Sequence, residues 1–177
     1  MNETPATPAP NPLARAQAGV ARGMGFALVV TIGVALLGYR RGDGMMLEAR
    51  GYTLGIALLV LGLWVAATVG NVARRRYGSA RAIDGGDGVD PKVDAANAIL
   101  RNTAEQALLA ALAYGTLTLL DDHSRTAIGL FAACFSAGRL LFWSGYRDGA
   151  AARALGFGLT FYPSVAALLM AAVALLR

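Results

Sequence analysis

Long apolar segments separated by short polar stretches run through most of this chain. A membrane-spanning helix needs roughly 20 apolar residues, and each segment approaches or exceeds that length. Lipid-exposed backbone has to satisfy its hydrogen bonds internally, and the segments lack the alternation of barrel strands. We therefore predict an all-α integral membrane protein with five spanning helices. The five segments are Gly23 to Tyr39, Tyr52 to Val72, Pro91 to Leu120, Arg125 to Tyr146 and Ala154 to Leu176.

The polar stretches predict the domain organisation. Residues 1–19 are rich in proline, alanine and threonine, and we expect a flexible tail there. The first apolar segment lacks the small-residue cleavage site of a signal peptide, so residues 20–51 are expected to form a retained helix and its loop. Residues 52–177 then form a four-helix membrane domain. Its expected connections are a glycine-containing loop at 74–89, a tight turn at 121–124 and a polar link at 147–156.

Composition supports the membrane assignment and narrows the chemistry. Hydrophobic residues make up 56% of the chain and charged residues 15%, against roughly 45–50% and 25% in soluble domains. Cys134 is the single cysteine, which excludes an internal disulfide, and we expect it to pack inside a span. His123 is the single histidine, so no His/Cys cluster has metal-ligand spacing. We expect no bound metal and a loop position without a chemical role for His123.

The formal net charge of +5 does not indicate nucleic-acid binding. Basic residues gather at the ends of apolar segments, as in Arg40-Arg41 and Arg74-Arg75-Arg76, which is typical of membrane topology signals. With five spans, the N-terminal tail, the 74–92 loop and the 147–153 link share one side, and that side is richer in Lys and Arg. The positive-inside rule then places the N-terminus in the cytoplasm and the C-terminus outside.

Three charged residues, Arg101, Glu105 and Arg139, lie inside the apolar segments. Ionisable side chains at membrane depth are costly, so they usually mark a protein interior or a wet cavity. Arg101 and Glu105 are spaced i, i+4, and Asn102 and Glu105 are spaced i, i+3, so each pair shares a helix face. The alternatives are that Arg101 and Glu105 only neutralise each other within their helix, and that Arg139 extends to the lipid headgroups.

A second polar stripe continues from Arg139 at helical spacing. It contains Phe142 and Tyr146, and Arg153 follows in the same direction beyond the end of the span. An interfacial anchor is the alternative role for Tyr146. Guanidinium groups bind carboxylates through paired hydrogen bonds, and Asn102 both donates and accepts. A cavity between the two helices would therefore suit a small zwitterionic ligand with several carboxylates.

The run from Arg101 to Gln106, Arg-Asn-Thr-Ala-Glu-Gln, resembles the Asn-x-x-Glu motif of the MAPEG family, the membrane-associated proteins in eicosanoid and glutathione metabolism. The segment from Gly138 to Gly149, followed by Arg153-Ala-Leu-Gly, resembles that family's later motif. The resemblance covers roughly residues 52–176. It implies a four-helix membrane bundle that forms homotrimers and binds glutathione between subunits near the cytoplasmic face. The chain looks like a bacterial-type member with an extra N-terminal helix.

The resemblance also implies roles for individual residues. Asn102 and Glu105 would contact glutathione, with Arg101 as an additional candidate ligand. Arg139 and Tyr146 would hold the carboxylates or the backbone of glutathione. Arg153 matches the family's arginine that stabilises the glutathione thiolate, and an adjacent cation does favour a thiolate over its thiol.

Three positions depart from the family pattern. Ala98 stands where an arginine is common, and Gln106 and Phe142 stand where tyrosines are common. We expect a glutathione-dependent transferase or peroxidase of the bacterial inner membrane, acting on lipophilic electrophiles or lipid hydroperoxides. The alternative is a non-catalytic membrane scaffold or lipid-binding protein. A transporter or channel is disfavoured, because the chain shows no internal repeat and no proline-broken span.

Overall fold

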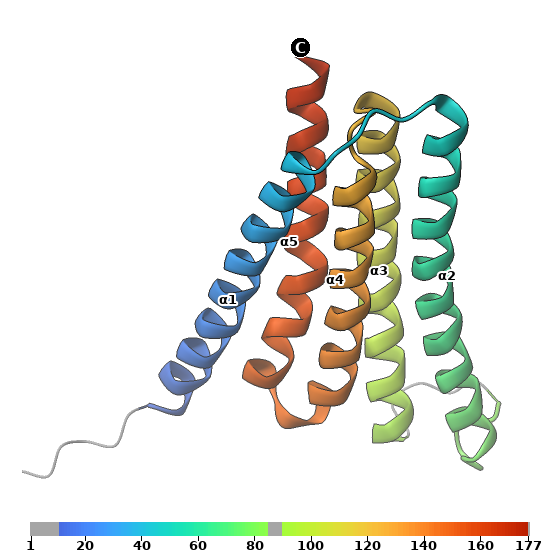
Figure 1. Ribbon diagram of the computed structural model, residues 1–177. Helices are drawn as coiled ribbons and strands as arrows, with labels where there is room; N and C mark the ends of the chain where they lie inside the picture. Colours follow the sequence, from blue (N-terminus) through green and yellow to red (C-terminus); the bar gives the residue numbers. More distant parts are fainter. Residues whose placement is uncertain (1–10, 85–89, 177) are drawn as a thin grey trace, which may run out of the picture.

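The computed structural model describes residues 11–84 and 90–176, and within them the fold is entirely helical. The helices stand side by side in one bundle (Figure 1). This confirms the predicted all-α architecture. The elements are α1 (Pro12–Arg40), α2 (Leu47–Tyr77), α3 (Pro91–Leu120), α4 (Arg125–Ser144), the 3-10 helix η1 (Gly145–Asp148) and α5 (Ala150–Leu175). Four helices are long and apolar enough to cross a membrane, namely α1, α2, α4 with η1, and α5, and α3 is of similar length.

Helix α1 begins earlier than the sequence suggested. The Asn11 side chain accepts a hydrogen bond of 3.0 Å from the backbone N–H of Leu13, and Pro12 occupies the first helical position. An Asn cap followed by proline is a strong start signal, because proline has no N–H that needs a partner there. Residues 12–19, which were predicted to belong to a flexible tail, are therefore helical. Residues 1–10 lie outside the described residues.

The reversal between α4 and α5 is much shorter than the predicted polar link at 147–156. A 3-10 turn continues α4 as far as Asp148, and α5 begins at Ala150. Gly149 alone separates them, with φ at +94°, a conformation that favours glycine because it has no Cβ. The 3-10 turn and Gly149 together turn the chain back on itself, so the ends of α4 and α5 are held together.

Helices α4 and α5 pack with their backbones in close approach. A Cβ on Gly138 would lie 2.7 Å from the carbonyl oxygen of Gly156, and a Cβ on Gly156 would collide with the backbone of Phe142. Small residues permit this approach, which is how helices associate in lipid. Between the later part of α3 and the early part of α4 the core is aromatic, with Tyr114 stacked on Phe131 at a centroid distance of 6.1 Å.

Helix α5 contains Pro163, contrary to the expectation that no proline interrupts a span. The helix nevertheless runs without a break from Ala150 to Leu175. Proline removes one backbone hydrogen bond from a helix. The neighbouring Ser164 hydroxyl donates to the carbonyl oxygen of Thr160 over 2.9 Å, so a side chain takes part in the local bonding.

The two ends of the bundle differ in their connections (Figure 1). The start of α1, the end of α2, the start of α3 and η1 lie at one end, which we call the cavity end. The α1–α2 connector, the α3–α4 turn and the end of α5 lie at the opposite end. There the backbone N–H of Met45 donates to the carbonyl oxygen of Asp122 over 2.9 Å, and Arg50 donates to the carbonyl oxygen of Leu119 over 3.2 Å. The predicted tight turn at 121–124 is confirmed.

Candidate functional site

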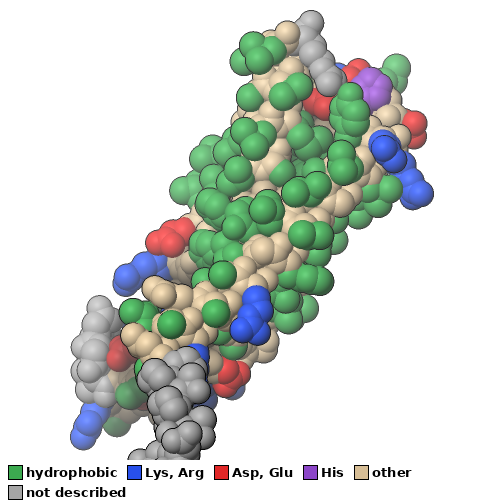
Figure 2. All heavy atoms as spheres, turned by 90° about the vertical axis from the view of Figure 1, so that its left-hand side faces the viewer, with side chains coloured by type: hydrophobic (Ala, Val, Ile, Leu, Met, Phe, Trp, Pro, Cys, Tyr) green, Lys and Arg blue, Asp and Glu red, His purple; other side chains and the backbone are tan. Residues whose placement is uncertain are grey.

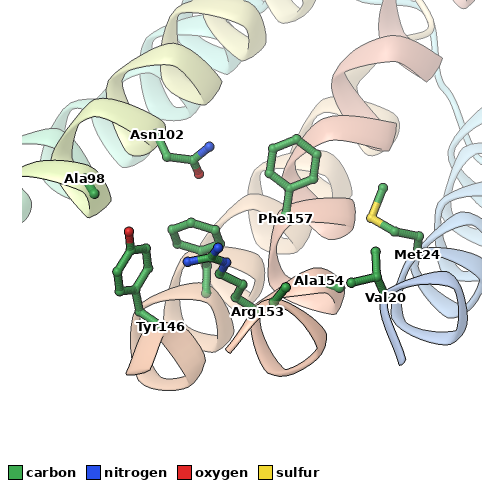
Figure 3. A pocket seen from close by; sticks show the side chains of 10 residues that line it. Val20, Met24, Ala98, Asn102, Tyr146, Arg153, Ala154 and Phe157 are labelled. Carbon is green, nitrogen blue, oxygen red and sulfur yellow. The ribbon is translucent and has the colours of Figure 1, made fainter. Parts of the chain in front are cut away.

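A cavity of about 460 Å³ lies at the cavity end of the bundle. Four helices and η1 contribute to it, and Figure 3 shows Asn102 from α3 facing the start of α5. Its wall is mainly apolar, with a small number of polar groups, which is the usual composition of a ligand site. The lining residues are Val20, Met24, Ala98, Asn102, Phe142, Tyr146, Ala150, Arg153, Ala154 and Phe157.

Arg139 lies behind the cavity wall rather than in it. Only 1% of its surface is exposed. One guanidinium nitrogen, Nη1, donates to Asn102 Oδ1 over 2.8 Å, and Nη2 donates to Thr160 Oγ1 over 2.8 Å. The same group lies 4.6 Å from the ring centroid of Phe142, within the range of a cation–π interaction. The alternative that Arg139 extends to the headgroups is therefore wrong, and its direct role here is to orient Asn102.

Tyr146 and Arg153 face each other at the mouth of the cavity (Figure 3). The guanidinium of Arg153 lies 4.9 Å from the ring centroid of Tyr146. Tyr146 in turn meets Phe142 edge-on at 5.7 Å. The ring of Tyr146 thus supports a cation at the cavity surface, which is a more specific position than that of a general interfacial anchor.

Arg101 and Glu105 do not line this cavity. Both side chains are exposed on α3, although they lie at helical spacing in the middle of an apolar stretch. Among the ion pairs of the described residues none joins Arg101 to Glu105. The alternative of an intrahelical pair that neutralises itself is thus not what the structure shows. The predicted cluster is divided: Asn102, Tyr146 and Arg153 line the cavity, Arg139 supports Asn102, and Arg101 and Glu105 point outward.

Two of the departures from the family pattern occur in the cavity wall. Ala98 presents a methyl group where a cation is common, and Phe142 presents a ring without a hydroxyl. Gln106, the third departure, is buried at 6% exposure, and its Oε1 atom is among the buried side-chain oxygens that lack a hydrogen-bond partner in the described part of the chain. The cavity wall is therefore less polar than the family pattern predicts.

No pattern in the sequence indicates that α1 belongs to the site. Val20 and Met24, one turn apart on α1, line the cavity opposite Asn102 (Figure 3). Helical spacing shows that the two residues share a face of α1, but no property of the sequence shows which helix that face meets. Thr160 was also missed, because a hydroxyl in an apolar span commonly bonds to its own helix. It does so here, donating to the carbonyl oxygen of Phe157, while also accepting from Arg139.

Asp121, Asp122 and His123 come together in the turn at the far end of the bundle. Their ligand atoms lie within 4.8 Å of one another. His123 Nδ1 lies 2.7 Å from Asp122 Oδ1, and the His123 backbone N–H donates to Asp121 Oδ1 over 2.9 Å. These contacts close the turn, and the cluster lies at the opposite end from the cavity.

The match to a family model decides the identity. The model of the MAPEG family matches residues 52–173, which is more than half of the chain. This chain belongs to the MAPEG family. It is thus a membrane protein of the family of glutathione and eicosanoid metabolism, as the two motifs had indicated. No curated protein and no solved structure shows a match to it.

The matched region begins within α2 and ends within α5, so α1 lies outside it. The residues that line the cavity of this MAPEG protein therefore come from two parts of the chain. Asn102, Tyr146 and Arg153 come from the family domain, and Val20 and Met24 come from the additional N-terminal helix.

Proposed function

We propose that this MAPEG protein is a glutathione-dependent transferase or peroxidase whose reaction takes place in the cavity between α1, α3 and α5. The observation that carries the proposal is the position of Arg153. Its guanidinium lies 4.9 Å from the ring centroid of Tyr146. Arg153 and Asn102 both line the same cavity. A fixed cation beside a bound thiol favours the thiolate, and the thiolate is the nucleophile.

The remaining polar residues supply orientation. Asn102 is fixed by its 2.8 Å hydrogen bond from Arg139, so its amide N–H groups are free to donate to a peptide-like ligand. In the transferase reaction, the thiolate sulfur attacks an electrophilic carbon and the leaving group departs with its electron pair. In the peroxidase reaction, two glutathione molecules reduce one hydroperoxide to an alcohol and water and are oxidised to the disulfide. The apolar part of the wall would hold the lipophilic partner.

A homotrimer is part of the proposal. The exposed Arg101 and Glu105 on α3 are costly against lipid, and MAPEG proteins are typically trimeric. A neighbouring subunit over this face would enclose both side chains and bring Glu105 to a shared site as a glutathione contact. We place the protein in the bacterial inner membrane, and the distribution of Lys and Arg supports an orientation with the cavity end, and hence the N-terminus, in the cytoplasm. Glutathione would then reach the cavity from the cytoplasm.

A second candidate function is a non-catalytic membrane scaffold or lipid-binding protein. The composition of the cavity wall favours it, because Ala98 and Phe142 remove a cation and a hydroxyl. Such a protein would retain the bundle and the cavity without binding the thiol.

A glutathione titration of the purified protein separates the two functions. A ligand that binds only the folded state raises the unfolding free energy by about 2.7 kcal/mol at a hundredfold excess over its dissociation constant. We expect a saturable rise in melting temperature that is reduced in Glu105→Ala. Arg153→Ala is expected to bind glutathione but to lose the thiolate absorbance of the bound ligand. Arg125→Ala, an exposed arginine at the opposite end, is the matched control. No rise at millimolar glutathione would support the scaffold.

A further inference from the structure

We propose that α1 supplies the wall that binds the apolar part of the lipophilic co-substrate, with Met24 and Val20 as its specificity-determining residues. This inference rests on the proposed function, because it assigns the second ligand of the same cavity. Both residues line the cavity, and both lie outside the region 52–173 that matches the family. The breadth of co-substrates accepted would then be a property of this chain rather than of the family domain.

The position of α1 is set by close backbone packing against α5. A Cβ on Gly23 would lie 2.9 Å from the backbone nitrogen of Leu155, and a Cβ on Gly158 would lie 2.5 Å from Ala27 Cβ. The two glycines thus let α1 and α5 approach so closely that a larger side chain at either position would have to move the helices apart. Met24 lies beside this contact, where its sulfur would be 3.4 Å from a Cβ on Gly158.

The cavity is chemically divided between its two flanks. Asn102 projects from α3 on one flank, and Val20 and Met24 project from α1 on the other, with Phe157 on the apolar side (Figure 3). α1 and α3 do not contact each other within the described residues, so the cavity opens between them. A ligand with a polar and an apolar half would therefore span from α3 to α1. Methionine is unbranched and polarisable, which suits it to contact alkyl and aryl groups of differing shape.

The face of α1 that points away from the cavity is apolar, as expected for a surface in contact with lipid. Figure 2 shows hydrophobic side chains over most of the face that carries α1, and Phe26 and Val29 are 61% and 67% exposed. Helix α1 thus has an apolar surface on both sides, one toward the bilayer and one toward the cavity. A lipophilic molecule therefore finds apolar surface on α1 both at the lipid-facing side and in the cavity.

The test uses S-alkyl glutathiones, which join a glutathione half to an alkyl chain of chosen length. Their dissociation constants are measured in nanodiscs for wild type, Met24→Trp, Val20→Trp and the control Val29→Trp, from S-methyl to S-octyl glutathione. In wild type we expect about a fourfold gain in affinity for each methylene that becomes buried, the equivalent of 0.8 kcal/mol. Met24→Trp and Val20→Trp fill the apolar half, so the gain with chain length should be lost while the affinity for glutathione itself is retained. Val29→Trp should behave as wild type.

The possible results distinguish this inference from the proposed function. If glutathione binds and the gain with chain length is the same in all four proteins, the inference is wrong and the proposed function stands. If no compound of the series binds wild type, the proposed function fails and the inference fails with it. Val20→Trp provides a second test of the wall should Met24→Trp displace α1 from α5, which a lowered melting temperature would reveal.

Discussion

Arg139 donates a hydrogen bond of 2.8 Å to Asn102 Oδ1 and thereby joins α4 to the cavity face of α3. The second bond of the same guanidinium, to Thr160, joins α4 to α5 as well. One buried cation therefore connects three helices directly behind the cavity. Its planar fork allows this, because two of its nitrogens point in different directions at once.

Arg139→Lys should weaken both the bundle and the site. Lysine keeps the charge but has one nitrogen in place of the two that separately bond Asn102 and Thr160, so it cannot keep both 2.8 Å bonds in their present geometry. We expect a loss of about 1.5–3 kcal/mol, the usual contribution of one hydrogen bond to a charged group, and a lower affinity for glutathione. Melting temperature and glutathione titration measure the two effects. Arg101→Lys, on the exposed face of α3, is the control for stability; an equal loss there would contradict the assigned role of Arg139.

Tyr146 is expected to act through its ring. The ring supports the Arg153 guanidinium at 4.9 Å, and a cation–π interaction of this kind contributes about 0.5–1 kcal/mol at an exposed site. Tyr146→Phe keeps the ring and should preserve thiolate formation by bound glutathione, whereas Tyr146→Leu should reduce it. The thiolate absorbance of the complex as a function of pH is the measurement. A loss in Tyr146→Phe as large as in Tyr146→Leu would assign the role to the hydroxyl instead.

Gly156→Ala should destabilise the α4–α5 pair. The added Cβ would collide with the backbone of Phe142 and would lie 2.6 Å from the carbonyl oxygen of Gly138. Overpacking of this kind costs about 1–3 kcal/mol, because backbone atoms must shift. Gly62→Ala on α2 is the matched control, since no atom lies within 4 Å of its added Cβ. Thermal unfolding of both variants in the same detergent should show the loss only for Gly156→Ala.

The start of α3 should loosen in acid. The backbone N–H of Lys92 donates to Asp90 Oδ1 over 2.8 Å, and this bond lowers the pKa of the Asp90 carboxyl below its ordinary value of 3.8. A lowered pKa in the folded state means that the stabilisation is complete above pH 3.8 and is lost as the pH falls through the folded-state value. Amide hydrogen exchange at Lys92 should accelerate over that range.

Helix α1 provides an internal control for the acid effect. Its cap is Asn11, which accepts from the Leu13 N–H over 3.0 Å and does not titrate. Protection at Leu13 should thus be independent of pH once the intrinsic exchange rate is corrected. Asp90→Ala should remove the difference between the two helices, and a persistent difference would show that another group controls the start of α3.

The sequence predicted most of the fold because its start and stop signals are local. Asp90 and Pro91 begin α3 and Leu120 ends it at the predicted residues. The prediction failed at Pro12, where an alanine-rich stretch resembles a tail unless its Asn-Pro cap is recognised. It also failed at Gly149, since a glycine does not reveal whether it adopts a positive φ.

The sequence predicted which residues of α3, α4 and α5 belong near the site, but not how they are arranged around it. Helical spacing placed Asn102 and Glu105 near one face of α3, yet Asn102 lines the cavity and Glu105 is exposed. Spacing along one helix cannot tell which neighbour covers which part of its surface. The involvement of Met24 depends on contact between α1 and α5, which no pattern within either helix encodes.

The two ends of the bundle are held together in different ways. The backbone of Met45 ties the α1–α2 connector to the α3–α4 turn, and Arg50 of α2 donates to the carbonyl oxygen of Leu119 in α3. The Thr126 hydroxyl adds a bond of 3.1 Å to the carbonyl oxygen of Arg41. The cavity end has no such cross-connection between α1 and α3 within the described residues. The far end therefore holds the connectors and the helix ends in register, whereas at the cavity end α1 is held by its close approach to α5 at Gly23. A change in the contact between α1 and α5 would thus alter the width of the cavity without disturbing the connections at the far end.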